Sequence, residues 1–180
     1  MATSEDVRID AQLLAGVKMD EATTFHILRE QIPNLVNEHF RAGKLLTEHF
    51  ETTERFEVYK PEKELVMVDR MINEWMFQTA EYNVTNEGIM VFHPGKYTVI
   101  YFSQPDLPQT QDHPIDLPRP YTAALKFYVA ARYRARLFGQ NDDSAISFYK
   151  EYTNAVETAD KFMDRRDSRR KRMPPGRRTV

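Results

Sequence analysis

Residues 117–163 read LPRPYTAALKFYVAARYRARLFGQNDDSAISFYKEYTNAVETADKFM, two helical patterns joined by a short polar turn. In the first pattern, Pro118 and Pro120 stand where a first helical turn tolerates a residue without an N–H donor. Apolar residues and alanines then recur with a helical period as far as Gly139, which suits a helix end. This pattern predicts a helix that is apolar around most of its circumference and needs burial on several sides.

The second pattern begins at residues 141–144, Asn-Asp-Asp-Ser, which offer several N-caps. Its apolar positions are spaced alternately by four and three residues: Ala145, Tyr149, Tyr152, Val156, Ala159 and Met163. A connection of about four residues makes consecutive helices antiparallel neighbours. The stretch 118–164 is therefore predicted to form an antiparallel helical hairpin in the core of the protein.

The composition is that of a globular chain. Of 180 residues, 41% are hydrophobic and 29% are charged, and there is no cysteine. Disulfides, thiolate chemistry and cysteine-ligated zinc are therefore excluded. The apolar runs fall far short of the roughly 20 residues that a membrane span needs, and the acidic N-terminus MATSEDVRID shows no secretory signal. We expect a protein that has no membrane partner.

The charges divide the chain into an acidic body and a basic C-terminal arm. Residues 165–180 hold eight basic residues and one acid, a net charge of +7, whereas the rest of the chain holds 17 basic and 26 acidic residues, a net −9. The eight cations are Arg165, Arg166, Arg169, Arg170, Lys171, Arg172, Arg177 and Arg178. This asymmetry favours an anionic partner for the arm. Because the arm cannot bury apolar area, we expect it to be disordered until a partner binds it.

The N-terminal third of the chain predicts helices. Residues 1–19 lack a clear start signal and are expected to be loop or a weak helix. Asp20 or Thr23 could cap a helical pattern that continues to about Glu51. Pro33 breaks or restarts this helix, since a proline suits only a first turn.

After Glu54 the apolar period changes from 3.6 to 2, so residues 55–103 are predicted to form an antiparallel β module. Met71–Phe77 is assigned to a strand. The short apolar strand Ile89–Phe92 is followed by a His-Pro-Gly-Lys turn and the strand Tyr97–Phe102. Both faces of this expected hairpin are apolar, so it is either sandwiched or presented to a partner.

The order of these segments gives the predicted fold class, α+β. Residues 104–117 are rich in proline and should form a linker that runs extended along the surface. A single domain is expected over 1–164, with helices at 20–51 and the helical hairpin forming a bundle into which the β module is inserted. Residues 165–180 form the basic C-terminal arm.

Motifs that carry chemistry are missing from the sequence. There is no Gly-rich phosphate loop, serine nucleophile elbow, paired-histidine zinc motif or calcium loop. His39 and His49, ten residues apart, would not share a face of a helix, and Asp112 and Asp116 are typical exposed acids of a turn. We therefore expect no enzyme, no catalytic residue, no metal and no cofactor.

Three short segments in a fixed order carry a resemblance to a known family. A strand reading GKYTVIY (95–101) precedes an acidic, proline-rich linker, DLPRPY (116–121) opens a helix, and that helix continues as ALKFYVAAR (124–132). Over residues 56–164 this order resembles the head-to-tail adaptor, or connector, proteins of tailed double-stranded DNA phages. The group includes the tubular tail gatekeepers of short-tailed phages.

The resemblance implies a structural virion protein of the neck or tail region, made in the host cytoplasm. In that family the subunits form a ring, commonly of twelve, beneath the portal, and the helical bundle builds the ring. The β part faces the tail or neighbouring subunits, and a C-terminal arm docks against the portal. The implied partners are the portal and tail proteins, further copies of the chain, and DNA that passes without sequence recognition. The eight cations of residues 165–180 would then bind the portal.

Two other functions stay open at the level of sequence. The basic arm could neutralise phosphates, as in a nucleic-acid-binding protein whose affinity falls steeply with salt. Against this, the body is acidic and contains no recognition motif. An enzyme or small-molecule binder that uses the two-faced hairpin as a pocket wall ranks last, because no convergent set of titratable groups is visible.

Overall fold

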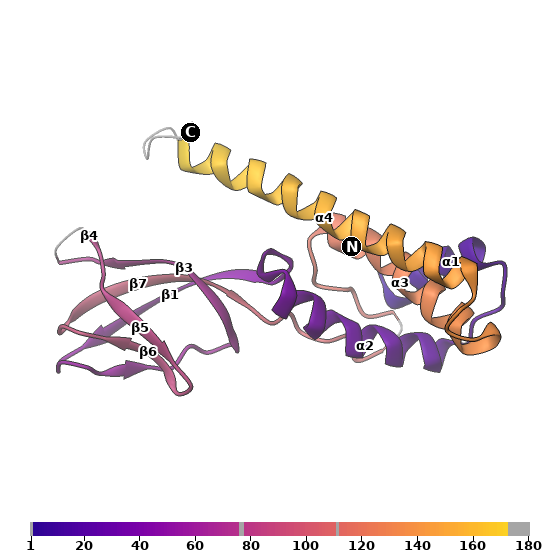
Figure 1. Cartoon of the computed structure of the whole chain (residues 1–180). Helices are drawn as coiled ribbons and strands as arrows, with labels where there is room; N and C mark the ends of the chain where they lie inside the picture. The colour runs from indigo at the N-terminus through magenta and orange to yellow at the C-terminus, as the bar shows by residue number, and fades with distance from the viewer. Residues whose placement is uncertain (1, 76–77, 111, 173–180) are drawn as a thin grey trace, which may run out of the picture. The chain divides into compact units, whose positions relative to one another are not determined.

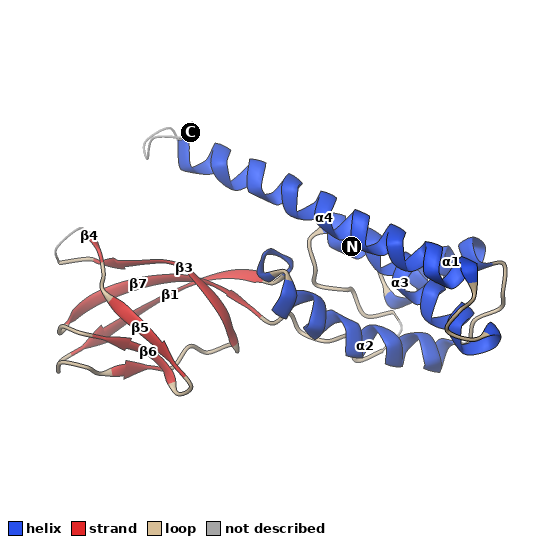
Figure 2. Cartoon of the chain, in the orientation of Figure 1, coloured by secondary structure: helices blue, strands red, loops and turns tan. Residues whose placement is uncertain are grey.

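A computed structural model of the protein describes residues 2–75, 78–110 and 112–172, with the backbone alone at 78–79 and 167–172. Over these residues the fold is mixed α+β, as predicted, with four α-helices and two small antiparallel sheets (Figure 2). Among the described residues, no helix has both the length and the apolar character that crossing a membrane requires.

The chain divides into two compact units. The helical unit comprises Met1–Gln31 and Leu107–Val180, and the β unit comprises Ile32–Asp106. The β unit is therefore inserted, in sequence, between the two segments of the helical unit.

The helical unit contains α1 (Ser4–Ala15), the first part of α2 (Glu21–Glu38), α3 (Arg119–Phe138) and α4 (Asp143–Arg172) (Figure 1). α1 and α4 each pack against α3, with little direct contact between the two. α3 and α4 run antiparallel at the positions where the sequence predicts helices. Gly139 ends α3 with a positive φ of 97°, and the Asp142 side chain accepts the Ala145 N–H at 2.9 Å to start α4.

Of the two alternatives predicted for residues 1–19, loop or weak helix, the structure shows a helix, α1, over Ser4–Ala15. Thr3 accepts the Asp6 N–H on its hydroxyl at 3.1 Å, and the Asp6 carboxylate accepts the Thr3 N–H at 2.8 Å. This is a capping box with aspartate at the third helical position. Gly16, at φ 65°, provides the left-handed C-cap. Thr3 and Asp6 are thus the start signal, with aspartate at the position where a capping box usually has Glu or Gln.

The helices expected over 20–51 are correct only in their first half. α2 continues through Pro33 and ends at Glu38, and η1 (Phe40–Ala42) is a single 3-10 turn. Residues expected to be helical at 44–51 instead form most of strand β1 (Lys44–Thr52). Apolar residues at 45, 46 and 50 fit a helical period as well as a strand. Pairing with β7 along the whole strand decides between them.

The β unit contains two antiparallel sheets. The first has the order β1-β7-β3-β4, with β3 at Leu65–Asn73, β4 at Gln78–Thr79 and β7 at Gly95–Ser103. The second has the order β2-β6-β5, with β2 at Val58–Tyr59, β5 at Tyr82–Thr85 and β6 at Gly88–Val91. The central strand β7 pairs with β1 on one side and β3 on the other.

The expected hairpin of Ile89–Phe92 and Tyr97–Phe102 is wrong in its pairing. β6 belongs to the second sheet and β7 to the first, so His93 and Pro94 carry the chain from one sheet to the other. The true hairpin is β5–β6, and its Gly88 has φ 147°, where an added Cβ would lie 2.3 Å from the Tyr59 carbonyl oxygen. Glycine is therefore required at this turn.

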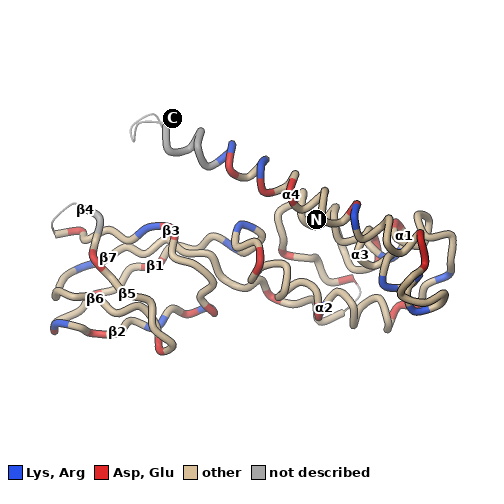
Figure 3. Tube along the Cα trace, viewed as in Figure 1, with Lys and Arg blue, Asp and Glu red and all other residues tan. Residues whose placement is uncertain are grey.

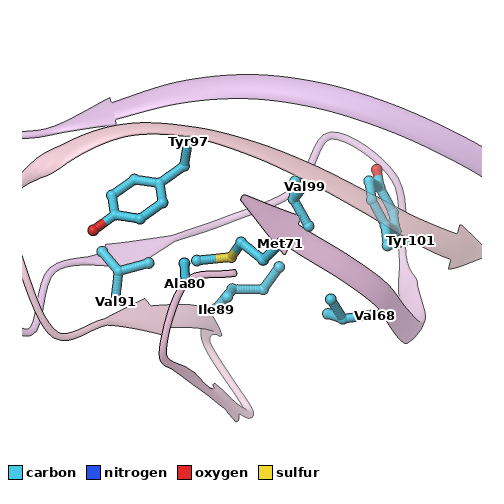
Figure 4. Packing of buried hydrophobic residues seen from close by; sticks show 8 residues of the cluster. All are labelled: Val68, Met71, Ala80, Ile89, Val91, Tyr97, Val99 and Tyr101. Atoms are coloured by element: carbon cyan, nitrogen blue, oxygen red, sulfur yellow. The ribbon is translucent and has the colours of Figure 1, made fainter. Parts of the chain in front are cut away.

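The core of the β unit lies between its sheets and confirms that one face of β7 is sandwiched. This core consists of eight buried residues, whose side chains Figure 4 shows together: Val68, Met71, Ala80, Ile89, Val91, Tyr97, Val99 and Tyr101. Phe50 of β1 stacks on Tyr59 of β2 with ring centroids 3.8 Å apart. Of the strand predicted at Met71–Phe77, β3 covers the residues to Asn73, and Met76 and Phe77 lie outside the described residues.

The proline-rich linker, residues 104–117, was predicted to run extended along the surface, but part of it is buried. Ile115 and Leu117 are buried, and the Ile115 N–H donates to the Ala2 carbonyl at 3.0 Å. Prolines prevent helix and central strand here, but apolar residues between them still pack onto the helical unit.

Candidate functional site

The predicted site is the cationic stretch that follows the helical hairpin, and α4 positions it. Close packing along α3 buries Ala145, Tyr152, Val156 and Ala159, one side of α4. Near the start of α3, the Tyr121 hydroxyl donates to Asp160 Oδ1 at 2.5 Å. α4 has 30 residues and α3 has 20, so α4 continues past its partner. The twelve residues from Lys161 to Arg172 add about 18 Å of helix.

Polar contacts fix the direction of α4. Tyr152 lies 5.1 Å from Tyr128 of α3 between ring centroids, and the Tyr152 hydroxyl accepts from Gln31 Nε2 of α2 at 2.8 Å. At the other end of the helix, both Nε and Nη2 of Arg134 donate to the Asp142 carboxylate at 3.0 Å. The Arg134 guanidinium lowers the pKa of Asp142, which therefore stays ionised while it caps α4.

Residues 165–172 of the cationic stretch are helical, which corrects the expectation of disorder for this part of the arm. Arg165 and Arg166 lie exposed on α4, and Figure 3 marks the Lys and Arg positions along this helix in blue. Positions 169, 170, 171 and 172 also lie on α4, and Arg177 and Arg178 lie outside the described residues. Arginine and lysine are good helix formers, and cations at a helix C-terminus interact favourably with the helix dipole.

The spacing of the cations follows the helix. Positions 165, 169 and 172 are separated by four and three residues, so they lie on one side of α4, with 166 and 170 beside them. A helix brings these positive charges within one continuous stretch, where arginine forms bidentate contacts with carboxylates or phosphates.

A groove on α4 lies beside this stretch, and it was missed at the level of sequence. It has a volume of about 400 Å³ and is lined by Pro120, Glu151, Asn154, Ala155, Thr158, Ala159 and Phe162. Phe162 is 54% exposed at its end. The signal that could have revealed it is small residues at 155, 158 and 159 next to an aromatic residue at 162, a hollow beside a projection on one helix face.

A second groove, of about 700 Å³, lies between α1 and α3. Its charged groups already have partners: Lys126 Nζ lies 3.6 Å from Asp10 Oδ2, and Asp6 belongs to the capping box of α1. Ile115 and Leu117 also line it. It therefore lacks a set of titratable groups directed at one ligand.

The β unit contains one group of side chains that resembles a catalytic relay. Thr98 Oγ1 lies 2.9 Å from His49 Nδ1, and Glu74 Oε1 lies 3.2 Å from the same nitrogen. The threonine hydroxyl also donates to Glu74 at 2.5 Å. A relay needs the nucleophile and the acid on opposite nitrogens of the imidazole, so this arrangement only ties neighbouring strands together. His39 lies before η1 and not on a common helix with His49.

Glu48 is the centre of a second polar cluster in the β unit. The hydroxyls of Tyr59 and Tyr101 both donate to its carboxylate. Burial, and then this hydrogen bond, raises the pKa of Tyr101 to about 12 and also raises that of Tyr59. Both tyrosines therefore stay protonated and act as hydrogen-bond donors, so their role is structural. Among the described residues, no three His, Asp or Glu side chains are grouped so as to hold a metal ion.

In comparisons with known proteins, no family model matches the chain, and no curated protein matches it either. Function must therefore be argued from the geometry of the cationic helix and the surfaces beside it.

Proposed function

We propose that this chain is a structural virion protein, a head-to-tail adaptor that docks beneath the portal as a ring and joins the DNA-filled head to the tail. In this proposal the helices form a bundle that builds the ring. The inserted β unit faces the tail or neighbouring subunits, and the cations of residues 165–180 bind the portal.

One observation carries the proposal: α4 extends about 18 Å beyond Asp160 as a helix that holds seven cations, Lys161 and the six between Arg165 and Arg172. A compact protein gains nothing from extending a charged helix past its own core, because helices draw most of their stability from tertiary packing. The extension therefore presents a positive, rod-like surface to another molecule. A groove of carboxylates on a portal ring is the kind of partner that bidentate arginine contacts recognise.

Two further features agree with an adaptor. The described residues show paired, structural carboxylates and tyrosines rather than a cleft of convergent acids or histidines. The remainder of the chain carries a net charge of −9, which suits a ring whose channel must let DNA pass without holding it.

The direct test is size measurement by light scattering, for the chain alone and mixed with a phage portal ring. We expect an assembly of many subunits with the portal. Charge reversal at Arg166, Arg169 and Arg170 to glutamate should weaken portal binding by about tenfold or more. The matched control is Lys150→Glu, an exposed cation of α4 in the part that packs on α3. A chain that ignores the portal at every concentration would contradict the proposal.

The alternative function is nucleic-acid binding by the same cations. It predicts affinity for mixed-sequence duplex DNA that falls steeply between 50 and 200 mM salt, roughly in proportion to the number of phosphates contacted. Removal of residues 165–180 should abolish that affinity. Retention of DNA by the full chain at physiological salt, together with no portal binding, would favour this alternative over the adaptor.

A further inference from the structure

One exposed side of α1, which borders the groove between α1 and α3, alternates acidic and apolar residues. Asp6, Ile9, Asp10 and Leu13 are all exposed, at the i, i+3, i+4 and i+7 positions of one helix face. Leu13 is 77% exposed, the highest value among the large hydrophobic residues that the structure describes. The opposite face of α1, with Val7 and Ala11, is buried against the helical unit. An amphipathic helix normally has one apolar face, so a second one indicates a further contact.

The side of α4 next to the start of α3 is hollowed, and exposed cations lie beyond the hollow toward the C-terminus. The groove of about 400 Å³ is lined by the small residues Ala155, Thr158 and Ala159, together with Glu151 of α4 and Pro120 of α3. Phe162 projects at its end, and Lys161 and Arg165 are exposed next to it. Along α4 toward the C-terminus, the groove is followed by an exposed aromatic residue and then by exposed cations.

The two faces are complementary when the helices lie antiparallel. With Leu13 in the hollow beside Thr158, Asp6 is seven residues back along α1 and Arg165 is seven residues forward along α4. Both spans are about 10.5 Å at 1.5 Å per residue, so Asp6 comes opposite Arg165. The same register sets Asp10 opposite Lys161.

Ile9 comes opposite Phe162 in this register. The apolar residues of α1 therefore meet the hollow and the aromatic residue of α4, and both acids meet a cation. A shift by one helical turn would lose at least one of these matches.

The two faces cannot meet within one chain, because α1 and α4 flank α3 on different sides. Lys126 of α3 contacts Asp10 of α1, and Tyr121 of α3 contacts Asp160 of α4. The five residues between these positions correspond to about 140° of rotation around α3. The partner for each face must therefore come from another molecule.

We propose that the α1 face of one copy of this chain docks in the α4 groove of the next copy. Such a contact is heterologous, because each subunit uses two different surfaces, so it repeats from subunit to subunit and closes into a ring when the rotation permits. Its assignment as the ring contact of an adaptor rests on the function proposed above, but the contact itself rests on the two faces. Arg165 serves this contact, and the cations from Arg166 onwards are left for the portal.

The test uses two single variants of the full chain, Leu13→Asp and Phe162→Asp. Both side chains are exposed, so each variant should fold, which circular dichroism checks. Each should weaken self-association by about tenfold or more, since a buried carboxylate would replace an apolar contact. Leu137→Asp, at a residue of α3 that is 55% exposed and lies on neither face, is the matched control and should assemble as the wild type does.

Mixing the two variants gives the sharper result. Leu13→Asp keeps an intact α4 groove and Phe162→Asp keeps an intact α1 face, so a mixture should form one-to-one pairs and no larger species. A symmetric contact between two α4 helices would instead leave Leu13→Asp fully associated. Unchanged assembly of either variant, or a mixture that stays monomeric, would overturn the inference.

Charge exchange tests the register. Asp10→Lys and Lys161→Glu should each weaken association by about twofold to fivefold, as exposed ion pairs do, and the chain with both changes should recover it. Assembly is measured in solution and on the portal ring, so the two proposals fail separately. Portal binding with intact rings in Leu13→Asp refutes this contact alone, and assembly through these faces without portal binding refutes the adaptor alone. A wild-type chain that stays monomeric in solution and on the portal overturns both.

Discussion

The helical unit and the β unit both bury large side chains, Tyr121 and Leu125 in the helical unit among them, but the helical unit buries many more alanines. The helices pack through alanines, including Ala11, Ala124, Ala130 and Ala159, all buried. The β unit fills the space between its sheets with Met71, Ile89, Tyr97 and Tyr101, which are among the largest fully buried residues. Small residues let helices approach closely, and large ones are needed to span the roughly 10 Å between facing sheets.

The same contrast holds for polar contacts. Tyrosine hydroxyls in the helical unit link one helix to another, as Tyr121 does with Asp160 and Tyr133 with the Asp20 carbonyl. In the β unit two of them meet on a single carboxylate, Glu48. The helical unit is thus held by contacts spread along its helices, whereas the β unit depends on a few large or central groups. The predictions below use this difference.

The largest effect is expected in the β core. Met71→Ala should destabilise the β unit by roughly 2–5 kcal/mol, since a buried methionine leaves a cavity that the sheets cannot collapse to fill. Emission from Trp75, the single tryptophan, reports on this unit, and far-ultraviolet circular dichroism reports mainly on the helices. We expect the emission midpoint in urea to fall more than the helical midpoint.

Met67→Ala is the matched control, because Met67 lies on the same strand and is 44% exposed. It should change stability by no more than about 0.5 kcal/mol. An equal loss in both variants would show that burial does not govern the β unit. A simultaneous shift of both probes in Met71→Ala would show that the two units unfold as one.

A smaller effect is expected at the carboxylate of the β unit. Glu48→Ala leaves the hydroxyls of Tyr59 and Tyr101 without their acceptor, at about 1–3 kcal/mol for each group that stays buried. Glu48→Gln keeps one acceptor oxygen and should cost less. Urea unfolding followed by Trp75 emission measures both. Glu51→Ala, an exposed residue of the same strand, is the control, and a cost equal to that of Glu48→Ala would refute the central role of Glu48.

The smallest expected effect is a difference between the two units in how much stability each loses at acid pH. Hydrogen bonds and ion pairs lower the pKa of Glu5, Asp6, Asp20 and Asp142 in the helical unit, and that of Glu74 in the β unit. A carboxylate with a lowered folded pKa contributes stability that is present above its unfolded pKa and is lost as the pH falls through the folded value. Acidification from pH 5 to below 3.8, the ordinary value for aspartate, should therefore weaken the helical unit first.

Asp142→Asn sharpens this prediction. Asparagine caps a helix as well as aspartate does but cannot titrate, so the loss of helical signal between pH 5 and pH 3 should become shallower in this variant. Circular dichroism and Trp75 emission, recorded over the same pH series, make the comparison. Loss of the tryptophan signal at higher pH than the helical signal would contradict it.

Local patterns in the chain were sufficient for several elements. The cap at 142, the stop at Gly139 and the apolar period place α3 and α4, and the alternation of Tyr97, Val99 and Tyr101 places β7, because a helix or strand with one buried face repeats that face at its own period. The charge difference between the acidic body and the basic arm also follows from the residue composition alone. Disorder was expected for the arm because it cannot bury apolar area, whereas arginine and lysine are good helix formers and continue α4 to Arg172.

Long-range pairing supplied the rest. Residues 44–52 suit a helix or a strand, and the ladder with β7, some fifty residues away in the chain, selects the strand. The assignment of β6 and β7 to different sheets depends on which strands are close in space, which no local period contains. The packing of α1 and of α4 on different sides of α3 likewise arises only when the helices assemble. The period of a helical pattern shows which residues share one side of the helix. Which of these sides remains exposed, and so able to bind a partner, depends on the elements that pack against the helix in the fold.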